Sequence, residues 1–359
     1  MGLIDRVVKE EIKKLERIKD TFDDRFDYLR LDKNERIIPF KEDHLNDLRR
    51  RIKSEDISGY AELGPIYRKL ADYLGVKADQ LLLATGSDLA IKSIYEACVS
   101  KGDSVVLHMP SYAMCRVYAG MFGAAIKAVP VKNDWSVDVD AMLAAVDPTT
   151  KMLAIENPNG FVGTKPELSQ IEYCAAWLKK KEVLLLIDEA YYYVENSKSE
   201  AVDLILKYPN LIVSQTFSKC HGIAGTRFGY LVGDPLLMKH ISKVRPTHEV
   251  TSLTVQAAGW ILDHPEILED YRKQIKESKA FLMSELGRLG IKYRDAHGNF
   301  MLIYCPDEGK TKGLTEKLKK KKILVRRPFE EPYLFGWIRI TMGSIEDSKI
   351  LAEALKTIL

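Results

Sequence analysis

The sequence has 359 residues, of which 46% are hydrophobic and 29% charged. This composition is typical of a folded protein that buries a large core, and the length predicts one large domain plus a smaller one. The 54 Lys and Arg residues nearly balance the 51 Asp and Glu residues. The small formal charge of +3 therefore gives no reason to expect nucleic acid as a partner.

The cysteine spacing and the hydropathy pattern exclude two further classes. No two cysteines form a CxxC pair, so we expect no metal site and no redox motif. No apolar run approaches the roughly 20 residues that span a bilayer, and the chain begins with a charged segment rather than a signal peptide. We therefore expect a cytoplasmic protein without membrane contact. The scattered cysteines are Cys98, Cys115, Cys174, Cys220 and Cys305.

The first 27 residues are interpreted as a helical arm. Apolar residues at Ile4, Val8, Ile12, Leu15 and Ile18 recur every three or four positions, which predicts one amphipathic helix over residues 4–21. Two roles stay open for this helix: it is a dimer arm, or it packs onto its own domain.

Strands and helices then alternate through residues 28–260, the predicted large domain. The apolar runs at 152–155, 183–187 and 211–213 lack alternation, as strands buried on both faces of a mainly parallel sheet do. The pattern predicts an α/β domain of βαβ units. The other predicted elements here are strands at 28–31, 81–84 and 104–108, and helices at 65–73 and 89–99.

The pattern changes near residue 261, where we predict a smaller α+β domain that extends to 359 and is joined by part of the N-terminal segment. Its predicted elements are a long charged helix at 265–289, strands at 300–304 and 337–341, and a terminal helix from 347.

A lysine follows the buried strand at 211–213. Ligands of open α/β sheets bind beyond the carboxyl ends of the strands, so Lys219 is placed for a cleft. Taken alone, a lysine is most often an exposed surface charge. Its neighbours distinguish it: the segment reads Ser214-Gln215-Thr216-Phe217-Ser218-Lys219 and continues through Gly222, Ala224 and Gly225 to Arg227.

This pattern, Ser-x-Thr-Phe-Ser-Lys-x-x-Gly-x-Ala-Gly-x-Arg, resembles the cofactor-lysine motif of the class I/II aminotransferases, and most closely that of the histidinol-phosphate aminotransferases. The likeness covers nearly the whole chain. It implies an aspartate aminotransferase-like fold with a seven-stranded, mainly parallel sheet between helices. It also implies pyridoxal 5'-phosphate as cofactor, held by Lys219 as a Schiff base.

The strand at 183–187 leads into Asp188-Glu189-Ala190-Tyr191, which resembles the family's Asp-x-Ala-Tyr. The resemblance implies that Asp188 bonds the cofactor's ring nitrogen and that Tyr191 bonds its ring hydroxyl. A carboxylate at that nitrogen keeps it protonated, so that the ring accepts electrons from a broken Cα bond. An acid after a buried strand is also an ordinary helix N-cap, so Asp188 alone is not specific.

A phosphate site is expected where Gly86, Ser87 and Asp88 open a helix, because backbone N–H groups and the helix dipole attract anions there. Such residues are also ordinary helix caps. The resemblance completes the site with Thr216, Ser218 and Arg227. It further implies that Tyr112 stacks on the cofactor ring and that Tyr60 reaches the cofactor phosphate of the neighbouring subunit in a homodimer.

One segment departs from the family pattern. Asn157-Pro158-Asn159-Gly160-Phe161-Val162-Gly163 stands where the family has Asn-Pro-Asn-Asn-Pro-Thr-Gly, so Gly160 replaces the asparagine that contacts the cofactor. Two alternatives follow: Asn159 makes that contact, or Tyr191 holds the ring hydroxyl with less help. We predict Asn159.

Two arginines near the C-terminal end, Arg326 and Arg339, resemble the pair that grips the substrate phosphate in the histidinol-phosphate enzymes. An arginine fork suits phosphate and carboxylate alike, and for Arg326 and Arg327 a surface salt bridge is the alternative. Leu31-Asp32-Lys33-Asn34-Glu35 resembles the start motif of the same family, and this resemblance implies that Asn34 contributes to the substrate site. Arg36 replaces the usual asparagine after it and is predicted as an extra anion contact.

The resulting hypothesis is a transaminase for a small phosphorylated amine or amino acid, with an amino donor or acceptor such as glutamate or 2-oxoglutarate. Residues 245–250 resemble relatives in capsule or phosphonate pathways, and His248 contacts substrate or caps a helix. Two alternatives remain. One is a decarboxylase of the threonine-phosphate type, which shares all cofactor residues, and the other is a non-catalytic relative that binds only the cofactor or a partner.

Overall fold

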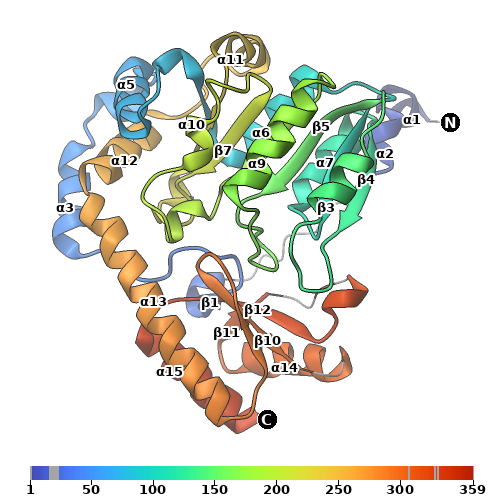
Figure 1. Ribbon diagram of the computed structural model, residues 1–359. Coiled ribbons are helices and arrows are strands. Elements are labelled where there is room, and N and C mark those ends of the chain that lie inside the picture. The colour runs from blue at the N-terminus through green and yellow to red at the C-terminus, as the bar shows by residue number, and fades with distance from the viewer. Residues whose placement is uncertain (1, 16–23, 306–307, 327–328, 330, 359) are drawn as a thin grey trace.

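The structure is a computed structural model that describes residues 2–15, 24–305, 308–326, 329 and 331–358. Within these residues a large α/β unit and a smaller α+β unit are visible, joined by the long helix α13, Pro265–Arg288 (Figure 1). No helix in the described ranges is both long enough and apolar enough to cross a membrane.

A seven-stranded sheet forms the centre of the large unit in the described chain, with the order β2-β8-β7-β6-β5-β3-β4. Only β8 runs antiparallel to its neighbours β2 and β7 among the pairs described, which confirms the predicted mainly parallel sheet. The strands are β2 (Leu81–Thr85), β3 (Ser104–Met109), β4 (Ala125–Pro130), β5 (Thr150–Glu156), β6 (Leu184–Asp188), β7 (Leu211–Thr216) and β8 (Phe228–Val232).

Helices cover both faces of this sheet because alternate residues of each strand enter different apolar clusters. On β7, for example, Leu211 and Val213 face one cluster and Ile212 faces the other. Helices α6 (Gly86–Cys98), α7 (Ala113–Met121) and α11 (Pro235–Ile241) pack on the Ile212 side. The other side is covered by α5 (Leu63–Leu74), α8 (Val139–Ala144), α9 (Leu168–Lys179), α10 (Glu200–Asp203) and α12 (Ser252–Asp263).

The smaller unit packs an antiparallel sheet of order β12-β10-β9 against α13 and α15. A short parallel pair joins β1 to β11, which places residues 29–31 beside the C-terminal part of the chain. The division at residues 27, 260 and 261 stays a prediction. The elements are β1 (Leu29–Leu31), β9 (Tyr293–Asp295), β10 (Phe300–Tyr304), β11 (Ile323–Val325), β12 (Trp337–Thr341), α14 (Glu308–Lys320) and α15 (Ile345–Ile358), with α3 (Glu42–Arg51) and α4 (Glu55–Ser58) preceding α5.

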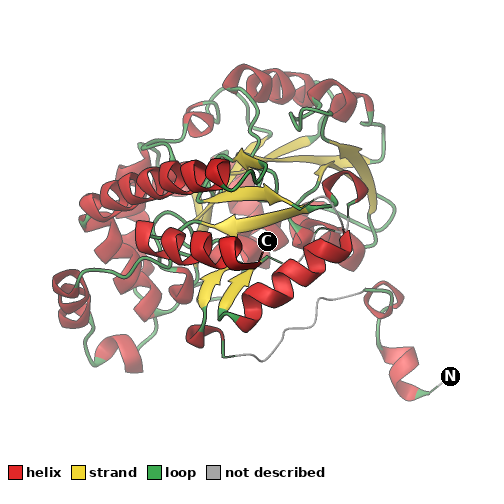
Figure 2. Ribbon diagram, turned by 90° about the horizontal axis from the view of Figure 1, so that it is seen from below, coloured by secondary structure: helices red, strands yellow, loops and turns green. Residues whose placement is uncertain are grey.

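The single helix predicted over residues 4–21 is wrong for the described part. Two short helices occur instead, α1 (Leu3–Val7) and α2 (Glu10–Lys13), because the backbone is extended at Val8 and Lys9. Residues 16–21 lie outside the described residues. Short helices need packing to be stable, and Leu3 and Ile4 stay exposed on α1. The short helices of the arm lie at one side of the molecule in Figure 2, and α2 contacts α7 there, with Glu11 of α2 paired to Lys101 at 2.8 Å.

Candidate active site

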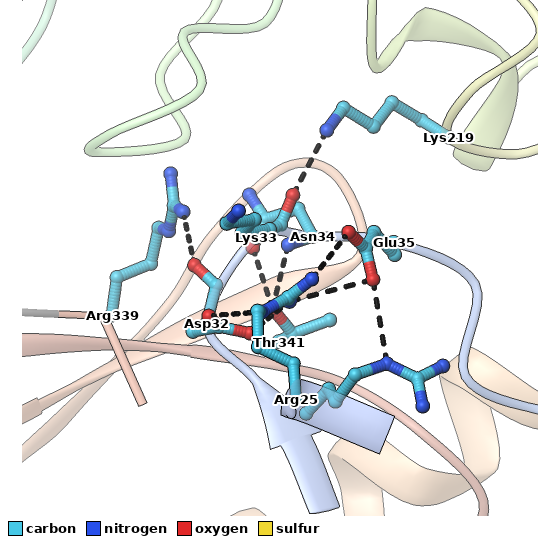
Figure 3. Close-up of polar contacts among 9 residues, drawn as sticks. Arg25, Asp32, Lys33, Asn34, Glu35, Lys219, Arg339 and Thr341 are labelled. Atoms are coloured by element: carbon cyan, nitrogen blue, oxygen red, sulfur yellow. Dashed lines mark hydrogen bonds and ion pairs between the residues drawn. The ribbon is translucent and has the colours of Figure 1, made fainter. Parts of the chain in front are cut away.

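Lys219 follows β7 and reaches across to the segment after β1. Its Nζ donates a hydrogen bond to the carbonyl oxygen of Lys33 at 3.0 Å (Figure 3) and lies 5.4 Å from the centre of the Tyr191 ring. Because β6 and β7 are parallel neighbours, the ends of these strands place Lys219, Asp188 and Tyr191 at one edge of the sheet. The three residues predicted to be catalytic therefore meet where the crevice of an open sheet lies.

Asp188 ends β6 as a buried carboxylate, 9% exposed. It accepts a hydrogen bond from the N–H of Ala190 at 3.1 Å. Burial raises its pKa to about 7, although the charge of Lys219 opposes the shift. A buried acid in this condition is stabilised by a further donor, such as a protonated ring nitrogen.

The hydroxyl of Tyr191 accepts a hydrogen bond from Asn34, a residue of the N-terminal segment. Asn34 is fully buried in a left-handed conformation (φ 55°), and its Nδ2 donates to the Tyr191 oxygen at 3.2 Å. Thr341 of β12 fixes this residue twice, since its hydroxyl donates to Asn34 Oδ1 and accepts from the Asn34 N–H, both at 2.9 Å. Asn34 thus lies beside the phenol rather than on the surface.

The residues predicted for phosphate binding lie around the start of α6. Gly86, Ser87 and Asp88 form its first turn, where N–H groups have no partner within the helix. Gly86 has φ 80°, and a Cβ there would lie 2.6 Å from Nη2 of Arg227. A Cβ on Gly229 of β8 would lie 2.2 Å from the Ser87 nitrogen. Both glycines therefore permit a close approach of backbone and arginine at this turn.

Hydroxyl groups line the other side of this turn. Thr216 Oγ1 donates to Ser218 Oγ at 2.9 Å, and Arg227 Nη1 donates to the same oxygen at 3.4 Å. The Asp88 carboxylate points instead to two phenols, accepting from Tyr112 at 3.2 Å and from Tyr118 at 2.7 Å. Asp88 therefore orients the ring of Tyr112.

The loop after β5 explains the departure at Gly160. Both polar atoms of the buried Asn159 side chain have partners within the protein: its amide donates to Pro110, and its carbonyl oxygen accepts from the N–H groups of Phe161 and Val162. A Cβ on Gly160 would lie only 2.7 Å from Cε2 of Tyr191. The structure thus uses Asn159 to shape the loop, and its predicted cofactor contact stays a prediction.

Arg339 of β12 is 6% exposed and reaches both segments that approach Lys219. It donates to the carbonyl oxygens of Gly160 at 2.6 Å and Asp32 at 2.8 Å, while its Nε has no partner among the described residues. The guanidinium of Arg326 lies 4.7 Å from the Phe161 ring centre. The two predicted substrate arginines therefore flank one loop. Arg327 lies outside the described residues.

The structure packs Arg36 against two aromatic rings. Its guanidinium lies over the rings of Phe40 and Tyr271, at 4.4 Å and 4.9 Å, and donates to the carbonyl oxygens of Ile38 and Ile267. A cation packed between rings and bonded to carbonyls does not face an incoming anion. The structure gives Arg36 a packing role, and its predicted anion contact stays a prediction.

Tyr60 lies on the surface, 82% exposed, and stacks on His248 with ring centres 4.1 Å apart. The structure does not bring it to Lys219 within this chain. Its exposure is compatible with a reach into a second subunit, and that role stays a prediction. The stack gives His248 a partner that the sequence did not indicate.

Two groups of residues near Lys219 were missed. Glu156 ends β5, is 7% exposed, and accepts from the N–H groups of Tyr112 at 2.6 Å and Gly160 at 2.9 Å. Its signal was present: a carboxylate directly before Asn157-Pro158, at the end of a buried strand. Arg25 binds Asp32 and Glu35, at 2.7 Å and 3.1 Å, and thereby fixes the segment that contacts Lys219 (Figure 3). Nothing in the local sequence indicated that pairing.

These residues fit pyridoxal phosphate. The amine of Lys219, the buried carboxylate of Asp188 and the phenol of Tyr191 lie together, and Asp188 has one hydrogen-bond donor among the described residues, the N–H of Ala190. The first turn of α6 lies beside them, with the hydroxyls of Thr216 and Ser218 and the guanidinium of Arg227. The close approach of Arg227 to Gly86, which a Cβ would block, forms a cradle for a phosphate dianion. Lys219 would join the aldehyde, Asp188 would hold the ring nitrogen and the α6 turn would hold the phosphate.

Comparison with known proteins supports this assignment. The family model described as "Aminotransferase class I and II" matches residues 29–355. Histidinol-phosphate aminotransferase 1 of Trichormus variabilis is 32% identical over 310 residues, covering 86% of each chain, and the enzyme of Thermoanaerobacter sp. is 30% identical over 361 residues, covering 99% of this chain and 100% of the relative.

Solved structures share the fold. Histidinol-phosphate aminotransferase from Sinorhizobium meliloti, solved with pyridoxal-5'-phosphate, superimposes with a TM-score of 0.88 at 23% identity, covering 98% of this chain and 97% of that one. A mutant aspartate aminotransferase from Thermus thermophilus gives a TM-score of 0.81 at 19% identity, covering 99% and 100%. The predicted aspartate aminotransferase-like fold is confirmed. The chain therefore belongs to the class I and II aminotransferases, which are pyridoxal-phosphate-dependent enzymes.

Proposed function

We propose that this enzyme transfers the amino group of a small phosphorylated amine or amino acid, with histidinol phosphate as the first candidate. The observation that carries the proposal is the loop between two arginines: Gly160 accepts from Arg339, Phe161 stacks on Arg326, and Tyr191 with Lys219 lies beside them. An anionic substrate held by these arginines would present its amine to Lys219. The relatives above support the same substrate class.

The bound cofactor supplies an aldehyde for the substrate amine and a ring that accepts the electron pair released at Cα. Asp188, a buried carboxylate, would hold the ring nitrogen protonated and so maintain that capacity. The amine of Lys219 would act as the base and acid that moves a proton at the substrate Cα. Tyr191, which accepts a hydrogen bond from Asn34, would donate to the ring oxygen of the cofactor. The N–H groups in the first turn of α6 and the side chains of Thr216, Ser218 and Arg227 would hold its phosphate.

The remaining parts of the proposal concern partners. Glutamate and 2-oxoglutarate are the proposed amino donor and acceptor, because Arg339 and Arg326 suit carboxylates as well as phosphates. A homodimer in which Tyr60 serves the neighbouring site rests on the exposure of that ring. A cytoplasmic location rests on the five cysteines, all of which are free thiols. The capsule or phosphonate pathway stays a prediction from residues 245–250, and the relatives favour transamination over decarboxylation.

A single-turnover experiment tests the proposal. The cofactor-loaded enzyme is mixed with histidinol phosphate, phosphothreonine or glutamate, while the cofactor absorbance and carbon dioxide are followed. Conversion of the cofactor to its amine form by histidinol phosphate and by glutamate, without carbon dioxide, supports the proposal. Carbon dioxide release from phosphothreonine without the amine form would overturn it in favour of the decarboxylase.

A further inference from the structure

The side chain of Glu156 connects the loop that carries Tyr112 to the loop that carries Gly160. Its Oε1 accepts from the N–H of Tyr112, in the loop after β3, and its Oε2 accepts from the N–H of Gly160, in the loop after β5. The contacts measure 2.6 Å and 2.9 Å, which is the range of hydrogen bonds to an ionised acceptor. One carboxylate therefore sets the distance between two backbone segments.

The same carboxylate lies one strand from Asp188. Glu156 and Asp188 are register partners at the ends of β5 and β6, and both are buried. Burial and the charge of Asp188 raise the pKa of Glu156 to about 7. His108 of β3 offers no compensating charge, because its burial lowers its pKa to about 4 and its Nε2 accepts from the Glu156 N–H. Burying an acid in such surroundings costs desolvation free energy. A buried acid with a shifted pKa beside a cleft is therefore a candidate for a functional role.

The contact extends to the substrate side. The N–H of Gly160 donates to Glu156, and its carbonyl oxygen accepts from Arg339 at 2.6 Å. The residue that the family pattern would place at 160 carries a side chain, whereas here Gly160 contacts Glu156 and Arg339 through its backbone. Glu156 therefore holds the backbone of Gly160, which supplies one of the two carbonyl oxygens that Arg339 contacts; the other belongs to Asp32.

We propose that Glu156 is a positioning residue: its carboxylate holds the Tyr112 loop and the Gly160 loop at the spacing that the cofactor ring requires, and through Gly160 it orients Arg339. This inference rests on the proposed function, because it assumes that Tyr112 stacks on the cofactor ring. No covalent step is assigned to Glu156.

The test uses Glu156→Gln with Glu189→Gln as matched control. Glutamine has one acceptor oxygen, and neither backbone N–H can turn away, so Glu156→Gln leaves one N–H facing an amide NH2. Glu189 is also buried, but its partners are side chains: the amides of Asn157 and Gln215, at 3.3 Å and 2.7 Å, and the hydroxyl of Ser199. The oxygens of both amides lack partners among the described residues, so either amide can flip to suit a glutamine in place of Glu189.

Two readouts separate positioning from folding: the Kd of pyridoxal phosphate for the apo-protein, and the visible circular dichroism of the bound cofactor, which reports its orientation. We expect Glu156→Gln to weaken binding by about tenfold to a hundredfold and to change the dichroic band. Glu189→Gln should keep the wild-type Kd within about twofold and keep the band. The inference is overturned if Glu156→Gln keeps both, or if the two variants lose affinity equally.

Glu156→Asp guards against a variant that fails to fold. Aspartate keeps the charge but is one methylene shorter, so it can serve one loop and not both. We expect a folded protein with an intermediate Kd, whereas a wild-type Kd would overturn the inference. If the wild-type protein itself binds no pyridoxal phosphate, the proposed function fails, a result distinct from any difference between the variants.

Discussion

The ring of Tyr191 occupies the space that a side chain at position 160 would need, since a Cβ on Gly160 would lie 2.7 Å from Tyr191 Cε2 and 3.2 Å from its hydroxyl oxygen. The glycine at position 160 and the position of the Tyr191 ring therefore depend on each other. Asn34 donates to the same hydroxyl at 3.2 Å, so an amide from the N-terminal segment lies where the loop supplies none.

Gly160→Asn should therefore disturb the site rather than restore a family feature. The new side chain must displace Tyr191, and overpacking of this kind costs about 1–3 kcal/mol. We expect a lower midpoint in urea unfolding and a weaker Kd for pyridoxal phosphate. Gly287→Asn is the control, because nothing lies within 4 Å of a Cβ at Gly287 on exposed α13. Unchanged stability and tighter cofactor binding in Gly160→Asn would contradict this prediction.

Lys219→Ala should remove the amine that joins the cofactor while leaving the phosphate cup of Thr216, Ser218 and Arg227 intact. We expect the visible band of the bound cofactor to shift to that of the free aldehyde, and kcat to fall on the order of a thousandfold or more. Absorbance of the dialysed protein and steady-state kinetics measure the two effects. Lys180→Ala, at the exposed end of α9, is the control and should behave as wild type. Retention of the wild-type band in Lys219→Ala would assign the cofactor to another lysine.

Sequence patterns predicted the buried strands of the sheet well. The runs at β5, β6 and β7 are continuous and apolar because helices cover both faces. We made no prediction for β4, β8, β9 and β11. β4 is an edge strand whose residues are largely exposed, so it lacks an apolar run. β8 is buried, but it directly follows Arg227 of the lysine motif and runs antiparallel to β7. It is therefore not part of a βαβ unit, which was the pattern used to predict strands.

The site was predictable only where a local motif carried it. Lys219, Asp188 and Tyr191 belong to short patterns at strand ends, and the structure brings them together. Contacts between distant segments left no local signal. Asn34 and Thr341 are 307 positions apart, and the packing of Arg36 on Tyr271 depends on α13. The contacts of Asn34 and Arg36 form only when distant segments pack together, so the residues next to them in sequence do not predict these contacts.

The buried Asp188 predicts a pH dependence for the apo-protein. Its pKa is about 7 in the fold and near 3.8 when unfolded, so the folded state binds the proton more tightly between these values. Stability from this group is then complete below about pH 4 and is lost as the pH rises through about 7. Each pKa unit corresponds to about 1.4 kcal/mol.

Urea unfolding of the apo-protein between about pH 5 and pH 8 measures this effect as the difference in unfolding free energy between wild type and Asp188→Asn. Surface ion pairs are the same in both proteins and cancel. We expect the wild type to lose stability relative to Asp188→Asn as the pH rises. A difference that is constant, or that grows in favour of the wild type, would show that Asp188 does not titrate near pH 7.

Arg339→Lys should separate recognition of the anion from assembly of the cofactor site. The arginine donates from two nitrogens to Gly160 and Asp32, and a lysine has one nitrogen that cannot reach both carbonyls in the same geometry. Loss of a planar fork to an anion costs about 1.5–3 kcal/mol, so we expect kcat/KM to fall by about tenfold to a hundredfold. The visible band of the cofactor should persist, because Arg339 is not among the residues that hold it. Arg288→Lys is the control, because Arg288 is an exposed arginine paired with Glu285.

Measuring the kinetics with histidinol phosphate and with glutamate in parallel shows whether Arg339 binds phosphate, carboxylate or both. An equal loss of kcat/KM for the two substrates assigns Arg339 to both, and wild-type kinetics for both would remove it from the substrate site.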